Sequence, residues 1–265
     1  MHMKINAVYI IYLQFTGSHF TSAFDIMKAK VLSKIEFVNW RWITIDNSIS
    51  GDVEIVKNQH FHLISGDNSA REFSGFDKGV KYLNRLNPRP NDIVIFANDT
   101  FHRSYGHQYL DSVTTEMIEK NISENGMLGY VDSFPHPVKG FNHSFSSWVR
   151  TSFFVQNYSL VNKITPFAIP MDRSRVFGDS ADEFFKSNDI LSENYKTYLK
   201  TWLFDDSSQE SEFKESWHSK ESLKESNFRK LQEKCWCILC EQNLSARTQD
   251  LGIPVFDIKQ NIGQK

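Results

Sequence analysis

The fold of this chain is decided by the stretch Asp92-Ile-Val-Ile-Phe-Ala-Asn98-Asp99-Thr100, an apolar run that ends in a polar cluster. A strand that is buried on both faces, as in a parallel sheet, reads as such a continuous apolar run. In open α/β sheets, ligands bind just beyond the carboxyl ends of the strands. We therefore expect Asn98 and Asp99 to lie at a ligand site.

Earlier segments have the same design. Residues 7–13 form an apolar run that opens into Thr16-Gly17-Ser18, and residues 40–45 form another that stops at Asp46-Asn47-Ser48. Carboxyl ends of parallel strands share one edge of a sheet. The polar residues that follow these runs should therefore meet Asn98 and Asp99 at a common site.

Helical segments separate the apolar runs. Residues 20–36 carry apolar side chains at the helical period, and residues 66–86 combine a turn-rich start with a helix that Asn87-Pro88 ends. Alternation of strands and helices in this order is typical of βαβ units. The sequence thus predicts an α/β fold, with a mostly parallel sheet flanked by helices.

The pattern changes after residue 126. Residues 127–131 read as a strand that ends at Asp132, and residues 148–155 alternate like a strand with one wetter face. Between them, Pro135-His136-Pro137 and the run 140–147 read as a loop over the site.

The last third of the chain is strongly charged, with widely spaced apolar residues, and reads as amphipathic helices. We expect residues 1–180 to form the ligand-binding core. Residues 181–265 would form a helical C-terminal region that completes the same domain. Residues 205–211 read as a flexible linker.

Composition excludes some classes of function. The formal net charge is −2, which gives no reason to expect a nucleic-acid-binding surface. The three cysteines all lie between residues 235 and 240 and form no disulfide framework, which indicates a reducing compartment. We expect them to be buried as small apolar residues rather than to bind zinc.

The N-terminal apolar run is interrupted at Gln14, which makes it too short to span a bilayer, and it lacks a secretory cleavage pattern. The expectation is a cytoplasmic protein. Contact with the inner face of the cytoplasmic membrane would be peripheral at most.

Four motifs carry a resemblance to a known family. They are Asp46-Asn47-Ser48, residues 68–79 with their Arg-Glu-Phe-Ser-Gly core, Asn98-Asp99-Thr100, and the run from Glu241 to Arg247. Together they resemble GT-A type nucleotide-sugar glycosyltransferases, in particular bacterial family 2 transferases and rhamnan synthesis protein F-like enzymes of surface polysaccharide assembly. The chain departs from the family where Asn98 precedes a lone Asp99 instead of a pair of carboxylates, and where Gln242 follows Glu241.

The resemblance implies transfer of a sugar from a nucleotide diphosphate donor to an oligosaccharide or lipid-linked glycan acceptor, with inversion, in O-antigen or capsule biosynthesis. It implies Mg²⁺ or Mn²⁺ held by Asp99, since hard oxygen ligands suit these ions. Without a metal, cationic side chains would neutralise the leaving diphosphate. The candidate donor-binding residues are Asp46, Asp67, Asn68, Arg71, Asn98, Asp99, Arg150 and His143.

The catalytic base has two candidates. The resemblance favours Glu241, which we expect near a helix start, where the macrodipole favours the ionised carboxylate. Asp132, at the end of its own strand, is the rival. We expect Glu72 to point away from Arg71, because adjacent residues on a helix do not face each other.

Two other classes of function remain open. A sugar nucleotidyltransferase would have a Gly-rich, basic phosphate loop after its first strand, whereas residues 14–18 contain one glycine and no Lys or Arg. A non-catalytic carbohydrate-binding or scaffold protein with a decayed site would explain the missing second carboxylate at Asn98. Acidic residues at strand ends are also common turn formers.

Overall fold

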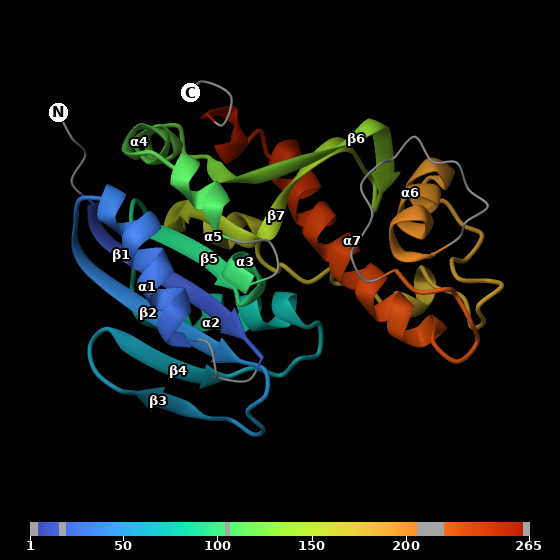
Figure 1. Cartoon of the computed structure of the whole chain (residues 1–265), viewed down its shortest axis with the longest axis horizontal. Coiled ribbons are helices and arrows are strands. Elements are labelled where there is room, and N and C mark those ends of the chain that lie inside the picture. The colour runs from blue at the N-terminus through green and yellow to red at the C-terminus, as the bar shows by residue number, and fades with distance from the viewer. Residues whose placement is uncertain (1–4, 16–19, 104–106, 206–219, 262–265) are drawn as a thin grey trace. The chain divides into compact units, whose positions relative to one another are not determined.

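The computed structural model describes residues 5–15, 20–103, 107–205 and 220–261 (Figure 1). Thr16-Gly17-Ser18 and all but the first residue of the predicted linker at 205–211 lie outside the described residues. Within the described part, none of the helices is long and apolar enough to cross a membrane.

The chain folds into two compact units. Unit 1 comprises residues 1–131, 149–168 and 251–265, and unit 2 comprises residues 132–148 and 169–250. The sequence prediction, a core at residues 1–180 completed by a helical region at residues 181–265 within the same domain, stays a prediction. Each unit combines segments that are distant in the chain, and a division made by reading along the sequence does not show such pairing.

The chain forms an eight-stranded mixed sheet, mostly parallel, with the order β3-β4-β2-β1-β5-β7-β6-β8. Six of its strands belong to unit 1, whereas β6 and β7 each have residues in both units. β1 pairs in parallel with β2 and β5, β2 with β4, and β6 with β8, whereas β3 and β7 are antiparallel to β4 and β5. The predicted α/β fold with a mostly parallel sheet is confirmed. The strands are β1 (Ile5–Gln14), β2 (Phe37–Asp46), β3 (Glu54–Val56), β4 (Phe61–Ser65), β5 (Ile93–Asn98), β6 (Met127–Gly140), β7 (His143–Asn157) and β8 (Val255–Asp257).

Helices cover both faces of the sheet (Figure 1). In unit 1 they are α1 (Phe20–Lys30), α2 (Glu72–Arg85), α3 (Thr100–Arg103), α4 (Thr115–Ser123) and α5 (Tyr158–Ile164), with the short helices η2 (Leu32–Lys34), η3 (Gln108–Ser112) and η5 (Ile258–Asn261). Unit 2 contains η4 (Arg173–Arg175), α6 (Glu193–Leu203) and α7 (Phe228–Asp250). A C-terminal helical part was expected, and α7 provides it.

β1 is buried on both faces, because successive side chains of a strand point to opposite sides. Val8 and Ile10 belong to the core that contains Met27 of α1. On the other face, a Cβ on Gly75 or Gly79 of α2 would lie 1.9 Å from Leu13 or 2.6 Å from Ile11, so these glycines let the helix approach β1 closely.

The second face also holds a cluster of buried aromatic rings. Phe96 of β5 stacks on Phe154 of β7 with 4.6 Å between the ring centroids, and Phe76 of α2 meets Phe96 edge-on at 5.5 Å. Phe73 and Phe76 are fully buried. Their interpretation as core residues rather than sugar platforms is therefore confirmed.

The loop predicted at Pro135-His136-Pro137 and residues 140–147 is wrong, except for the turn at Phe141-Asn142. β6 continues through Asp132 and Pro135-His136-Pro137 to Gly140, and β7 begins at His143. Phe141 and Asn142 both have positive φ (53° and 69°), as a two-residue type I′ turn requires. The prolines suggested a loop because proline cannot donate a hydrogen bond to a neighbouring strand. On the side of β6 that faces β8, however, only Met127–Gly129 are paired, so the later residues of β6 need no donor on that side.

Helix α7 carries the three cysteines. Cys235 and Cys240 are buried and Cys237 is half-buried. Burial raises the pKa of the Cys235 thiol well above its ordinary value, which keeps the thiol neutral. The expected burial is confirmed for Cys235 and Cys240.

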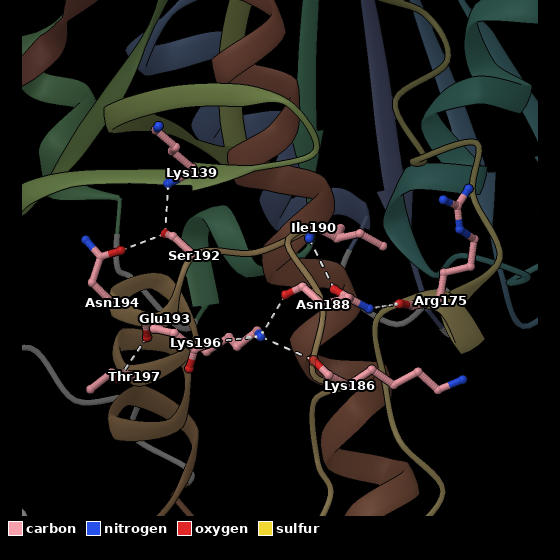
Figure 2. Close-up of polar contacts among 10 residues, drawn as sticks. All are labelled: Lys139, Arg175, Lys186, Asn188, Ile190, Ser192, Glu193, Asn194, Lys196 and Thr197. Atoms are coloured by element: carbon pink, nitrogen blue, oxygen red, sulfur yellow. Dashed lines mark hydrogen bonds and ion pairs between the residues drawn. The ribbon is translucent and has the colours of Figure 1, made fainter.

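A buried ammonium group fastens α6 to the preceding segment within unit 2 (Figure 2). The side chain of Lys196 is only 7% exposed, and its Nζ donates to the carbonyl oxygens of Lys186 (3.2 Å) and Asn188 (3.1 Å) and to Oε1 of Glu193 (2.8 Å). All three ammonium protons are therefore engaged. One turn earlier, Ser192 Oγ accepts a hydrogen bond from the backbone N–H of Lys139 in β6 (3.0 Å).

We predict that Lys196→Met lowers the free energy of unfolding by about 2 kcal/mol, because both carbonyl oxygens would lose their charged donor. Urea unfolding followed by tryptophan fluorescence measures this loss. The matched control is Lys200→Met, one turn further along the same helix at an exposed position, which should change stability by less than about 0.5 kcal/mol. Equal effects of the two substitutions would contradict the role of Lys196.

Candidate functional site

The carboxyl ends of four parallel strands lie at one edge of the sheet in unit 1. Gln14 of β1 pairs with Asp46 of β2, and Asp46 pairs with Ser65 of β4. On the other side of β1, Leu13 pairs with Asn98 of β5. The predicted meeting of three strand ends is confirmed, and β4 adds a fourth.

Asp99 lies where the strand order reverses. From β1 the chain proceeds to β2 on one side, and it returns to β5 on the other side after α2. Such a topological switch point opens a crevice beyond the strand ends in doubly wound sheets. The backbone N–H of Asp99 donates to the carbonyl oxygen of Leu13 (2.9 Å), which places this half-buried residue at that point.

The side chain of Asn98 has a local role. Its Oδ1 accepts hydrogen bonds from the backbone N–H (3.0 Å) and the hydroxyl (2.5 Å) of Thr100, at the start of α3. An asparagine that forms such a turn stabilises the chain after the strand. Asn98 therefore orients the segment that carries Asp99.

Asp46 and Asp67 also form turns. In Asp46, one carboxylate oxygen accepts from the N–H (2.8 Å) and the hydroxyl (2.6 Å) of Ser48, and the other accepts from Gln14 Nε2 (2.8 Å). The exposed Asp67 accepts from the N–H (2.9 Å) and the hydroxyl (2.8 Å) of Ser69. Partial burial raises the pKa of Asp67, but the bonds from Ser69 outweigh it and lower the pKa.

The segment between β4 and α2 is shaped by Asn47. Its Nδ2 donates to the carbonyl oxygen of Arg71 (3.1 Å) and to Oδ1 of Asn68 (3.4 Å). Asn68 and Arg71 both have positive φ (53° and 50°). A Cβ at Gly66 would lie 1.7 Å from Asn47 Oδ1, so this position requires glycine.

Glu72 supplies a carboxylate that sequence reasoning placed outside the site. It is half-buried in the first turn of α2, and burial raises its pKa. Its own backbone N–H and Arg71 oppose this shift, whereas the charge of Asp99 adds to it. The two carboxylates are therefore within electrostatic reach of each other.

The rule on adjacent residues holds only within a regular helix, so it does not decide where Glu72 points, and that expectation stays a prediction. Arg71 precedes α2 and has a backbone conformation that no helix contains (φ 50°, ψ −125°). One sequence signal could have identified Glu72. This residue begins the helix that follows the end of another parallel strand, β4.

Arg150 lies at the same edge of the sheet. Phe153 of the antiparallel β7 pairs with Ala97 of β5. Arg150 lies three residues before Phe153, on the side of the carboxyl end of β5. The guanidinium of Arg150 lies 4.2 Å from the ring centroid of Tyr130, and Lys259 Nζ lies 4.4 Å from the same centroid. Two cations thus flank one tyrosine.

The remaining candidates belong to unit 2. Nδ1 of the half-buried His143 is bonded to Oδ2 of Asp250, at the end of α7. Asp132 is buried within β6, so its expected place at a strand end is wrong. Glu241 lies well inside α7 rather than near its start, so the argument from the helix dipole does not apply to it.

Around Glu241, a buried polar pair lies within unit 2. The hydroxyl of Tyr195 in α6 donates to Oε1 of Gln242 (2.5 Å). Burial raises the pKa of Tyr195 well above its ordinary value, and the charge of Glu241 contributes to this shift. The prediction missed Tyr195, because no local pattern marks a partner 47 residues away in the sequence.

No group of three His, Cys, Asp or Glu side chains that could hold a metal ion occurs within residues 5–15, 20–103, 107–205 and 220–261. Asp99 and Glu72 are two hard oxygen donors, which is the number that proteins often supply to Mg²⁺ when phosphate oxygens complete its shell. These residues fit a metal that is shared with a bound diphosphate.

No protein-family model matches this sequence, and no curated protein matches it significantly. The family resemblance therefore stays a prediction.

We predict that Glu72→Gln stabilises the protein at neutral pH. A raised pKa in the folded state means that folding disfavours the ionised carboxylate, whose ordinary pKa is 4.5. The gain should therefore shrink as the pH falls and disappear below that value, where glutamate is neutral in both states. Urea unfolding at several pH values measures this, with the exposed Glu124→Gln as the control. A Glu72 variant less stable than the wild type at pH 7 would contradict it.

Proposed function

We propose that this chain is a GT-A-like glycosyltransferase that moves a sugar from a nucleotide diphosphate donor to a glycan acceptor. The observation that carries the proposal is the switch point between β1 and β5, where the chain leaves β5 at Asp99. Glu72, in the first turn of α2, is within electrostatic reach of Asp99. In a doubly wound sheet the switch point is the place for a phosphorylated ligand. The biological setting would be assembly of a bacterial surface polysaccharide.

The site offers two ways to stabilise a departing diphosphate. The start of the 14-residue helix α2 carries partial positive charge, and Arg71 adds a full charge beside it. Arg150 brings a further guanidinium to the same edge of the sheet. Opposite charge aimed at the leaving group lowers the barrier for transfer.

A divalent cation would be held by Asp99 and Glu72. Mg²⁺ or Mn²⁺ supplies charge neutralisation on the diphosphate when it is bound. Glu72 must lose its proton to act as a ligand, and its raised pKa shifts this loss to higher pH. Metal binding should therefore strengthen as the pH rises. We therefore propose that the enzyme depends on a metal. If it does not, Arg71 would be the cation that neutralises the diphosphate.

Asp46 and Asp67 remain the candidates for the ribose and base of the donor. Oδ1 of Asp46 accepts two hydrogen bonds from Ser48, whereas Oδ2 accepts only one, from Gln14, and keeps acceptor capacity for a ligand. The same bonds fix the geometry of the carboxylate. A ligand hydroxyl would meet an acceptor that is already oriented.

A non-catalytic carbohydrate-binding protein is the second candidate function. It is favoured by the local turn roles of Asn98, Asp46 and Asp67, each of which the fold explains without a ligand. The electrostatic repulsion between Asp99 and Glu72 favours the transferase instead, because two like charges within reach of each other raise the free energy of the folded chain.

Calorimetry with a panel of nucleoside diphosphates and nucleotide sugars, with and without MnCl₂, tests donor binding. We predict that Asp99→Asn weakens binding at least about tenfold, because a charged ligand contact is lost. The control is Asp52→Asn, whose side chain is 98% exposed in the same unit. If no nucleotide binds the wild type, the transferase proposal is wrong.

Transfer assays then separate the two candidate bases. The variant of the true base, Glu241→Gln or Asp132→Asn, should lose about 10²-fold or more in kcat and keep its nucleotide affinity. Full turnover in the Glu241 variant would reject that residue and leave Asp132. Donor binding without transfer or donor hydrolysis in the wild type would favour the non-catalytic alternative.

A further inference from the structure

A polar cavity of about 320 Å³ lies at the opposite, amino-terminal edge of the parallel strands in unit 1. Its walls come from the start of β1 and β2, the turn before β4, and the segment that follows α2. The volume is at the lower end of the range for small-molecule sites. The residues that matter here are Tyr9, Arg41, His60, Arg89 and Asp92.

The charge of this cavity is positive. Arg41 and Arg89 are its cations, and Asp92 is its only acidic lining residue. Asp92 is 1% exposed, and its carboxylate accepts from the backbone N–H groups of Ala7 (3.0 Å) and Arg89 (2.7 Å). These bonds turn the carboxylate towards the backbone, where it anchors the wall of the cavity.

Donors remain available in the cavity. Arg41 uses Nε on the carbonyl oxygen of Gln59 (3.3 Å) and lies within hydrogen-bonding reach of the Tyr9 hydroxyl. A guanidinium has five N–H groups, so most of those on Arg41 have no acceptor in these contacts. Among the described residues, no hydrogen bond or ion pair engages the exposed guanidinium of Arg89.

One wall of the cavity is rigid. The ring of His60 stacks on Trp40 with 4.4 Å between centroids and 10° between planes. Its Nδ1 donates to the carbonyl oxygen of Trp40 (2.9 Å), and its Nε2 meets the amide of Gln59 (3.1 Å). A wall that is fixed in this way loses little conformational entropy when a ligand binds.

We propose that this cavity binds a small organic anion, whose phosphate or carboxylate group lies between Arg41 and Arg89. Guanidinium groups suit both kinds of anion, because they donate two parallel hydrogen bonds to planar or tetrahedral oxygens. The amide side chains of Asn39, Gln59 and Asn87 in the lining suit a ligand that also carries hydroxyl groups. This site is independent of the transferase proposal.

Calorimetry on the full-length chain tests the site, with inorganic phosphate, glucose 6-phosphate and glucuronate as probes at constant ionic strength. The two organic probes separate phosphate from carboxylate recognition. We expect at least one of them to bind, and Arg41→Gln and Arg89→Gln each to weaken that binding about tenfold or more. Arg89 is exposed, so its variant tests the site even if Arg41→Gln impairs folding.

The matched control is Arg85→Gln. Arg85 also belongs to this end of α2, but Glu54 accepts hydrogen bonds from its NH1 (2.8 Å) and NH2 (3.1 Å), so its guanidinium is committed elsewhere. This variant should bind the probe as the wild type does. An equal loss in Arg85→Gln would reveal general attraction to a basic surface and overturn the proposal.

Two further results would overturn the proposal. One is that none of the three probes binds the wild type. The other is that Asp99→Asn, at the opposite edge of the sheet, alters anion binding while the two arginine variants do not. Nucleotide titrations test the site at the carboxyl edge separately. A negative result at one edge therefore does not count against the proposal for the other edge.

Discussion

Burial of β1 on both faces is the constraint on which the rest of the structure depends. Val8 and Ile10 on one side and Ile11 on the other are completely inaccessible, so each face needs its own helix. α1 covers one face and α2 covers the other. The helices lie on opposite faces because the chain moves from β1 to β2 on one side and later returns through α2 to β5 on the other side. This reversal of strand order between β1 and β5 sets the position of Asp99.

The same parallel pairing gives the sheet two chemically different edges. At the carboxyl edge, the charges of Arg71 and Asp99 both act on the carboxylate of Glu72, in the first turn of α2. At the amino edge, Arg41 and Arg89 outnumber the carboxylate of Asp92, which the backbone holds. Because parallel strands all end on one side, charges that are far apart in the chain accumulate at each edge.

Buried polar contacts fix the helices of unit 2. Lys196 holds the segment before α6 through two carbonyl oxygens, and Tyr195 on the same helix holds Gln242 of α7. A buried donor without its acceptor is costly, so these contacts favour one arrangement of the helices over others. They also bring the hydroxyl of Tyr195 into the electrostatic environment of Glu241.

The sequence by itself determined β1, β2, β5 and α2, because unbroken apolar runs, the helical period and Asn87-Pro88 act locally. It also placed Asp46 and Asn98 at strand ends that meet. Only the tertiary structure decided that the charge of Asp99 acts on Glu72, that β6 continues through its prolines, and that Glu241 lies in the middle of a helix. The reason is physical: each of these depends on a partner segment, on the missing neighbour of an edge strand or on the packing of α7, and none of these is encoded in local spacing.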